Sequence, residues 1–178
     1  MIYFISDTHF NHENIIKYCN RPFKDVKEMD YEILTNWNKK VKKDDIIYHL
    51  GDLALGDKEE FFELSKNLNG KKYLIKGNHD NWSINSYKDM GFIVLTNPPI
   101  KLKKYKFLLS HVPLSDKYIP QEYINIHGHI HNKYLHDFIY ESEIKNYSIK
   151  KHVNISCDVT NFMSISIEEI NKLIKNKI

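Results

Sequence analysis

The chain has 178 residues, of which 42% are hydrophobic and 28% charged, values typical of one globular domain with a full core. They exclude a largely disordered chain and a small fold that depends on disulfides. The formal net charge of +3 favours anionic ligands in general but does not single out nucleic acid.

The two cysteines and the first residues indicate a compartment. Cys19 and Cys157 have no CxxC spacing, so they signal neither a disulfide framework nor a zinc knuckle, and a reducing interior fits them best. Met1 is followed at once by a predicted strand, and no apolar run reaches the roughly 20 residues that a membrane span needs. We therefore expect a cytoplasmic protein without membrane contact.

Strands and helices alternate in the first half of the chain. Asp25-x-x-Glu28 resembles a capping box, and apolar residues at helical spacing follow it from Met29 to Val41. The predicted elements are a strand at 2–6, a short helical turn at 14–19, a helix at 26–41, a strand at 45–50, a helix at 59–68 and a strand at 72–76. This order predicts a parallel sheet with right-handed crossovers, in which ligands bind beyond the carboxyl ends of the strands.

The second half of the chain is mostly β. Strands are predicted near residues 93–96, 100–103, 106–109, 124–127, 134–139 and 152–156. Ser166-x-x-Glu169 is a capping box for a final helix. No repeat, low-complexity linker or domain boundary interrupts the chain. The sequence therefore predicts one α/β domain over residues 1–178, a two-sheet sandwich flanked by helices.

Residues of metal-ligand type follow five of the predicted strands. They are Asp7-Thr8-His9, Gly51-Asp52, Gly77-Asn78-His79-Asp80, Ser110-His111 and His127-Gly128-His129-Ile130-His131. Taken alone, the histidine-rich stretch is also compatible with a solvated loop. In an extended backbone, His129 and His131 would project to one side while Gly128 lets the chain pass close to a bound ion. The five strand ends together predict a ligand cluster at the carboxyl edge of a sheet.

Such a cluster suits a pair of divalent metal ions. Two ions about 3.5 to 4 Å apart can clamp a phosphoryl group and hold a water at lowered pKa, and such a pair needs a bridging carboxylate. Asp52 is the best candidate because it stands alone after Gly51, whereas Asp7 and His9 form a pair that can serve one ion. Asn78 offers a carbonyl oxygen without added charge.

These motifs, in this order, resemble those of the calcineurin-like metallophosphoesterases. The run from Asp7 to Asn14 and the segment Asn20-Arg21-Pro22-Phe23 resemble the small, uncapped bacterial and phage members in particular. That resemblance continues to Asn154-x-Ser156-x-Asp158 and so covers nearly the whole chain. It implies a four-layer αββα sandwich, with two mixed β-sheets flanked by helices and a site for two metal ions.

The resemblance also implies a role for each motif residue. Asp7, His9 and His131 would hold the first ion, and Asn78, His111 and His129 the second. Asp52 would bridge the two ions. His79 matches the histidine that donates a proton or stabilises charge at the leaving group, with Asp80 or another carboxylate orienting it.

Three further residues are candidates for substrate binding. Arg21 is the single arginine among 26 basic residues, and its planar guanidinium could grip two phosphate oxygens. A structural pair between Arg21 and a nearby carboxylate is the alternative. His12 and Asn14 are also candidates to face the substrate, and the alternative for His12 is to orient His9. Of the remaining histidines, His49 is expected in the core and His127 on the opposite face, while His136 and His152 lack motif context.

The resemblance implies a hydrolase that cleaves phosphodiester or phosphomonoester bonds with metal-activated water. A mixed nitrogen and oxygen ligand set favours Mn, Fe, Zn or Ni over Ca. A small phosphorylated molecule or a nucleotide is the expected substrate, and nucleic acid is possible. The alternatives are a nuclease of the same superfamily and a non-catalytic scaffold, as in the retromer subunit that resembles this fold. Oligomeric state is not predicted.

Overall fold

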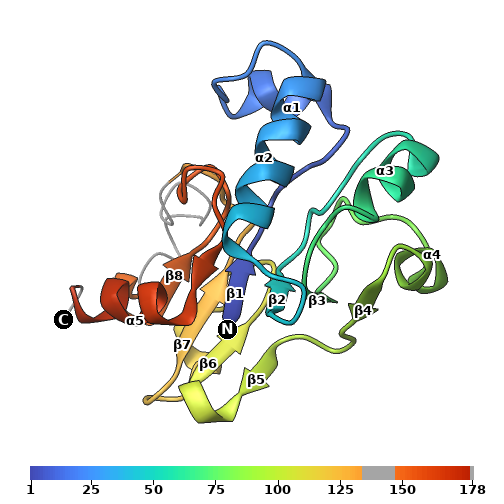
Figure 1. The fold of residues 1–178 in the computed structure, drawn as a ribbon. Coiled ribbons are helices and arrows are strands. Elements are labelled where there is room, and N and C mark those ends of the chain that lie inside the picture. Colours follow the sequence, from blue (N-terminus) through green and yellow to red (C-terminus); the bar gives the residue numbers. More distant parts are fainter. Residues whose placement is uncertain (134–146, 177–178) are drawn as a thin grey trace.

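Two β-sheets lie face to face in the computed structural model, which describes residues 1–133 and 147–176 (Figure 1). The strand predicted at 134–139, together with Tyr134, His136 and Tyr140, lies outside the described residues. No helix in the described ranges is long and apolar enough to cross a membrane.

The first sheet has the strand order β4-β3-β2-β1-β9. Its strands are β1 (Ile2–Ile5), β2 (Ile46–His49), β3 (Lys71–Leu74), β4 (Phe92–Val94) and β9 (Ile165–Ser166). The strands β1 to β4 are parallel to their neighbours, and β9 is antiparallel to β1. The predicted parallel sheet is therefore confirmed, with β9 as an edge strand that the sequence did not indicate.

The second sheet has the order β5-β6-β7-β8 and is also mixed. Its strands are β5 (Ile100–Leu102), β6 (Phe107–Leu109), β7 (Ile124–His127) and β8 (His152–Asn154). Only the pair β5 and β6 is antiparallel among these described strands. An isolated bridge between Ser6 and Ser156 joins the two sheets just beyond β1 and β8. This bridge brings the carboxyl ends of both sheets to one edge of the molecule.

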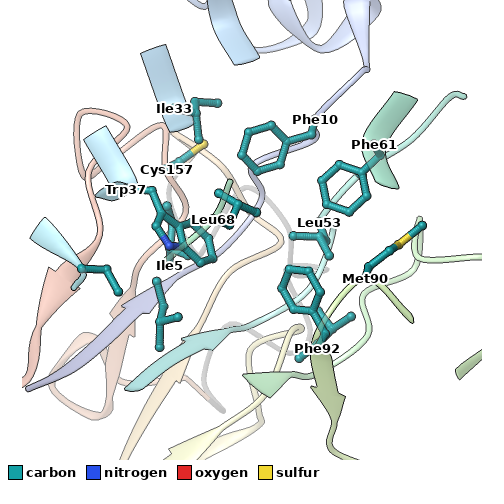
Figure 2. Packing of buried hydrophobic residues seen from close by; sticks show 14 of the residues in the cluster. Ile5, Phe10, Ile33, Trp37, Leu53, Phe61, Leu68, Met90, Phe92 and Cys157 are labelled. Carbon is teal, nitrogen blue, oxygen red and sulfur yellow. The ribbon is translucent and has the colours of Figure 1, made fainter. Parts of the chain in front are cut away.

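Helices cover the outer face of the first sheet. They are α1 (Glu13–Tyr18), α2 (Val26–Lys40), α3 (Lys58–Ser65) and α4 (Ile84–Asp89), while α5 (Ile167–Lys175) packs elsewhere. The predicted apolar stripe of α2 is buried, and Figure 2 shows Ile33 and Trp37 on the side of Ile5 of β1, in the same cluster as Phe61 of α3. Burying such side chains stabilises the fold by about 1.5 to 3 kcal/mol each.

A second apolar core lies between the two sheets. Phe4 of β1 contributes to it, whereas its neighbours Tyr3 and Ile5 point to the helices, as strand alternation requires. Ile167 and Ile170 place α5 against this inter-sheet core. The outer face of the second sheet is covered, in the described residues, by the chain around the 3₁₀ turn η2 (Asp116–Tyr118). The predicted αββα class, two mixed sheets with flanking helices, is confirmed.

The helix caps follow the sequence closely but not completely. Ser166 and Glu169 form the full predicted capping box of α5. Asp25 accepts the Glu28 N–H at 2.8 Å, whereas the Glu28 carboxylate accepts the N–H of Lys24 instead of that of Asp25. The cap of α2 is therefore a chain of two bonds, which satisfies the same number of free N–H groups.

Asp30 on α2 makes the stability depend on pH. The side chain accepts the Asn11 N–H, and burial raises its pKa from 3.8 to about 7. Because the pKa is higher in the folded state, the stabilising proton is present below about pH 4 and lost as the pH rises through 7. As the pH rises from 4 to 8, we expect the free energy of unfolding of Asp30→Asn to increase relative to that of the wild type by up to about 4 kcal/mol. This value corresponds to about 1.4 kcal/mol per pKa unit.

Urea unfolding at several pH values measures this difference. The exposed Glu32 of the same helix provides the control Glu32→Gln. Parallel pH profiles for the wild type and Asp30→Asn would show that the Asp30 carboxyl does not titrate in this range.

Candidate metal centre

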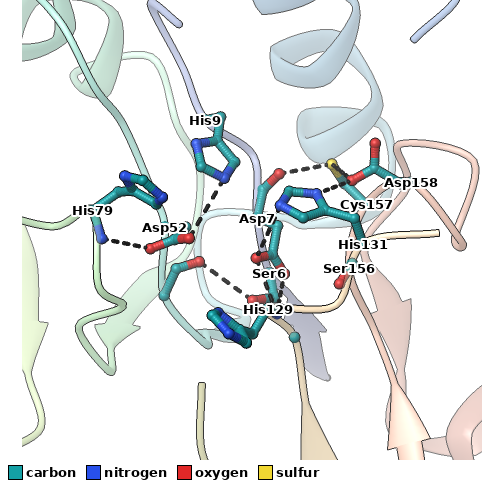
Figure 3. A network of polar contacts seen from close by, with 12 residues as sticks. Ser6, Asp7, His9, Asp52, His79, His129, His131, Ser156, Cys157 and Asp158 are labelled. Atoms are coloured by element: carbon teal, nitrogen blue, oxygen red, sulfur yellow. Dashed lines mark hydrogen bonds and ion pairs between the residues drawn. The ribbon is translucent and has the colours of Figure 1, made fainter. Parts of the chain in front are cut away.

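The loops that follow β1, β2 and β7 are tied together by backbone hydrogen bonds. Asp7 N–H donates to Gly51 O and His9 N–H donates to Asp52 O, each at 3.0 Å. Gly128 N–H donates to His111 O at 3.0 Å, which joins the loops after β6 and β7. The polar residues that follow five strands therefore meet at one edge, as expected from the sequence, and Figure 3 shows those that follow β1, β2, β3 and β7.

Five of the expected ligand residues have left-handed backbone conformations. The φ angles are 58° at Asp7, 51° at His9, 55° at Asp52, 71° at His129 and 50° at His131. The prediction of an extended backbone at His129 and His131 was therefore wrong. The chain turns between them, so the two imidazoles join different groups of ligand atoms, and the same-side argument does not apply.

The first group consists of Asp7, His9 and His131, whose ligand atoms lie within 4.8 Å of one another. His9 Nδ1 lies 3.2 Å from His12 Nδ1, and burial lowers the pKa of His9 to about 2, so its ring is neutral. His9 Nε2 is buried and has no hydrogen-bond partner in the described part of the chain. In the tautomer whose Nδ1 donates to His12, Nε2 carries a lone pair beside a carboxylate and fits a metal ligand.

Asp158 orients His131 within this group. Asp158 Oδ2 lies 2.8 Å from His131 Nδ1, while His131 Nε2 faces Asp7 Oδ1 at 4.0 Å. Burial opposes the charged imidazole, but the hydrogen bonds to Asp158 and Cys19 outweigh it and raise the pKa of His131 to about 10. Because Nδ1 is held by a carboxylate, Nε2 is directed at the centre, as is typical of metal-binding histidines.

The second group consists of Asp52, His111 and His129, with Asn78 beside them. Asn78 Oδ1 lies 3.0 Å from both His111 Nε2 and His129 Nδ1. His111 Nδ1 lies 2.8 Å from Leu50 O and donates to it, which leaves Nε2 as the nitrogen that faces the group. Four candidate ligand atoms therefore converge from four different loops.

Asp52 lies between the two groups. Its Oδ2 is 3.5 Å from His9 Nε2 and 3.4 Å from His111 Nε2, and its Oδ1 accepts the His79 N–H at 2.9 Å. Burial opposes ionisation of Asp52, yet the interaction with His111 and the His79 N–H outweigh it and hold the pKa of the carboxyl below its usual value. Asp52 is thus an ionised carboxylate in the position that a bridging ligand would occupy.

Two glycines leave room for these carboxylates. A Cβ atom at Gly77 would meet the Asp52 side chain, and one at Gly128 would meet Ser6 Oγ and Asp7 Oδ2. Glycine is therefore needed at both positions because the chain passes directly against the ligand residues. Together with the unpartnered His9 Nε2, this cradle fits two divalent ions held by nitrogen and oxygen atoms.

A substitution at Gly128 tests the cradle. We expect Gly128→Ala to weaken metal binding about 10- to 100-fold, because the added methyl displaces the Asp7 carboxylate. Bound metal per chain, measured by plasma mass spectrometry during dialysis, gives the affinity. Gly91→Ala is the control, because Gly91 has a φ of +82° but its Cβ would meet only Lys72 side-chain atoms at 3.5 and 3.6 Å. Equal metal affinity of both variants would contradict the cradle.

Arg21 has the structural role that the sequence left open, not that of a substrate clamp. Its Nε and Nη2 donate to Asp158 at 2.9 and 3.0 Å, and Nη2 also donates to Asp7 O at 2.7 Å. Nη1 donates to Thr8 O at 2.9 Å and contacts Met29 Sδ at 3.4 Å. All five N–H groups are engaged and the side chain is 0% exposed, so no donor is left for a phosphate.

The other two candidates for substrate contact differ in position. His12 is half-buried and touches the rings of both His9 and His79, at centroid distances of 5.2 and 6.4 Å. Its position is compatible with orienting His9 and with facing the substrate. Asn14 is exposed on α1, and none of the hydrogen bonds in the described residues joins it to a ligand group. The exposed ring of His79 lies 5.4 Å from that of His9, at the rim of the first group.

Asp80 and Asp158, which the sequence motifs include, have positioning contacts that the sequence did not predict. The buried Asp80 carboxylate accepts the N–H groups of Asp52, Leu53 and Gly77 at 2.7 to 3.0 Å. It therefore joins the loops after β2 and β3 instead of orienting His79. The motif identified Asp80 but suggested the wrong partner, His79, whereas the contacts of Asp158 are long-range and leave no local signal.

Known proteins resemble this chain over most of its length. The sequence model of the calcineurin-like phosphoesterase family matches residues 1–164. An uncharacterized protein of Methanocaldococcus jannaschii is 40% identical over 176 residues, which is 98% of this chain and 91% of that protein. The Gene 66 protein of Mycobacterium phage L5 is 36% identical over 81 residues, 44% of this chain and 39% of that protein.

A solved structure is also similar. The crystal structure of a protein of unknown function from Aquifex aeolicus superposes with a TM-score of 0.71 at 34% sequence identity. The likeness covers 98% of this chain and 99% of that one.

Proposed function

The chain belongs to the calcineurin-like phosphoesterase family, and from this premise we propose that it is a metal-dependent hydrolase of phosphoric esters that prefers diesters. The observation that carries this proposal is the position of Asp52, one oxygen of which lies 3.4 to 3.5 Å from a histidine nitrogen of each ligand group. That arrangement supports a site for two ions with one shared carboxylate.

The residues of the site divide the chemistry among them. Asp7, His9 and His131 would hold one ion, Asn78, His111 and His129 the other, and Asp52 both. When bound, the ions would neutralise phosphoryl charge and supply hydroxide at neutral pH. His79 would donate a proton to the departing ester oxygen, because its ring is exposed at the rim of the first group.

Finer features of the activity belong to the same proposal. Mn, Fe, Zn or Ni suit the mixed imidazole and oxygen ligands, and the substrate would be a small phosphorylated molecule or nucleotide. The two free cysteines, Cys19 and Cys157, support a cytoplasmic location. Residues 1–178 would act as a single domain.

Hydrolysis after metal reconstitution tests the proposal. The protein is stripped of metal, loaded with each ion in turn and assayed with bis-p-nitrophenyl phosphate and p-nitrophenyl phosphate. We expect diester turnover that needs metal and falls about 10²- to 10⁴-fold in His79→Ala, with the bound metal unchanged. His152→Ala, which replaces a buried histidine paired with Asp116, is the control. Two bound ions without turnover of either ester would contradict the proposal and favour a scaffold.

A further inference from the structure

A cavity adjoins the candidate metal centre on the side of the second ligand group. It has a volume of about 270 Å³. Its walls come from three loops, and they include the ligand residues Asn78 and His111 together with Pro98, Pro99, Val112 and Leu114. A group bound between these apolar side chains would therefore lie next to the second ligand group of the metal centre.

Two polar side chains of this cavity already make hydrogen bonds within the protein. Lys76 Nζ donates to Trp82 O at 2.9 Å and lies 5.5 Å from the Tyr87 ring centroid. The Ser110 hydroxyl donates to Val112 O at 2.7 Å and accepts from Asn125 at 2.9 Å. No carboxylate occurs among the described residues that line the cavity. Apart from the Lys76 ammonium and the ligand residues, the walls are therefore apolar or internally hydrogen-bonded, and the cavity suits a largely apolar group.

A buried asparagine holds one wall of the cavity in place. Asn125 is 0% exposed, and its Oδ1 accepts the Leu114 N–H at 2.8 Å. Its Nδ2 donates to Leu108 O at 3.0 Å and to the Ser110 hydroxyl. The segment from Ser110 to Leu114 is thus fixed by the β7 side chain before any ligand arrives, which reduces the entropy lost on binding.

We propose that this cavity holds the group that stays attached to the phosphate after hydrolysis, and that this group carries an aromatic ring of nucleobase size. The proposal rests on the proposed phosphoesterase function. A cavity of 270 Å³ is just below the range of about 300 to 1,000 Å³ for complete ligands, so it fits one arm of a molecule. His79, the expected proton donor to the leaving group, lies at the other ligand group, beside His9. A nucleoside phosphodiester has such a ring on the arm that stays on the phosphate, and it is the substrate class of this proposal.

Two substrates with the same leaving group distinguish the contribution of the cavity to kcat/KM from that of the hydrolytic step. Thymidine 5′-(p-nitrophenyl phosphate) and methyl p-nitrophenyl phosphate both release p-nitrophenolate and differ in the retained arm. We expect the wild type to favour the thymidine ester at least about tenfold in kcat/KM, because burial of the ring adds binding energy. The preference should fall below about threefold in Val112→Asp, which places a charge in the apolar wall. Val112 is 50% exposed, so the substitution spares the core.

Ile84→Asp is the matched control, since Ile84 is 41% exposed at the start of α4 and does not line the cavity. This variant should keep the wild-type preference. If an oligothymidylate is cleaved and Val112→Asp lowers its cleavage equally, the nucleoside comes from nucleic acid. If a cyclic nucleotide is cleaved and the oligothymidylate is not, the nucleoside comes from a free nucleotide.

Calorimetry with the metal-loaded protein gives a readout that needs no turnover. Thymidine 5′-phosphate should bind at least about tenfold more tightly than methyl phosphate, and Val112→Asp should remove the difference. This selectivity without hydrolysis of any ester would support the cavity assignment while contradicting the proposed function. Equal binding of both phosphates, or equal kcat/KM for both esters, by the wild type would overturn the inference.

Discussion

Asp52→Asn is expected to lower phosphodiester turnover at least about 10³-fold. The substitution keeps the shape of the side chain and can still accept the His79 N–H through its carbonyl oxygen, but it removes the charge between His9 and His111. An amide oxygen bridges two cations poorly, so at least one ion should be lost. Steady-state kinetics and metal content per chain measure the two effects separately.

The exposed Asp44 offers the control Asp44→Asn, which should keep full activity and both ions. Residual activity above one tenth of the wild type in Asp52→Asn, with two ions still bound, would exclude Asp52 as the bridge. Loss of activity with metal content intact would instead show that the negative charge acts mainly on the reacting water.

Arg21→Ala should have the largest effect on stability, about 3 to 5 kcal/mol. The substitution removes the guanidinium from the buried Asp158 carboxylate and leaves His131 as its remaining partner, and breaking a buried pair by removing one partner has a cost of that order. It also frees the carbonyl groups of Asp7 and Thr8. Arg21→Lys should recover little, because an ammonium cannot make the two parallel bonds to Asp158.

Urea unfolding of the metal-free protein measures this change in stability separately from any change in metal binding or activity. Asp158→Asn in the Arg21→Ala background should recover part of the lost stability, since it removes the carboxylate that has lost the guanidinium. The exposed Lys17 on α1 gives the control Lys17→Ala. A loss below about 1 kcal/mol, with a raised KM for the diester, would instead support direct contact between Arg21 and the substrate.

The sequence indicated which residues gather at the site because each follows a strand of the same sandwich. The prediction that Asp7, Asp52 and His111 lie close together required no knowledge of side-chain geometry. It required only that the strand ends meet at one edge of the sheet. The local conformation was not accessible in this way. Left-handed φ angles at His129 and His131 arise from hydrogen bonds between distant loops, such as the bond from His129 N–H to Asp7.

Interactions between distant residues and short elements were missed for a related reason. Arg21 and Asp158 are 137 residues apart, so no local pattern distinguishes their pair from a substrate clamp. Helix α4 has six residues, which is too short for an apolar period to appear. Its one local signal is Ser83, whose side chain accepts the Ser86 N–H as an N-cap.

Selection for heat resistance and selection for hydrolysis would drive the same positions in opposite directions. Left-handed backbone at a non-glycine residue is unfavourable by about 1 to 2 kcal/mol, and glycine avoids that penalty. A library selected only for folding after heating should therefore accumulate glycine at the five left-handed ligand positions, Asp7, His9, Asp52, His129 and His131. Each such gain would delete an expected ligand, so a thermostable catalyst has to be sought among substitutions outside these loops.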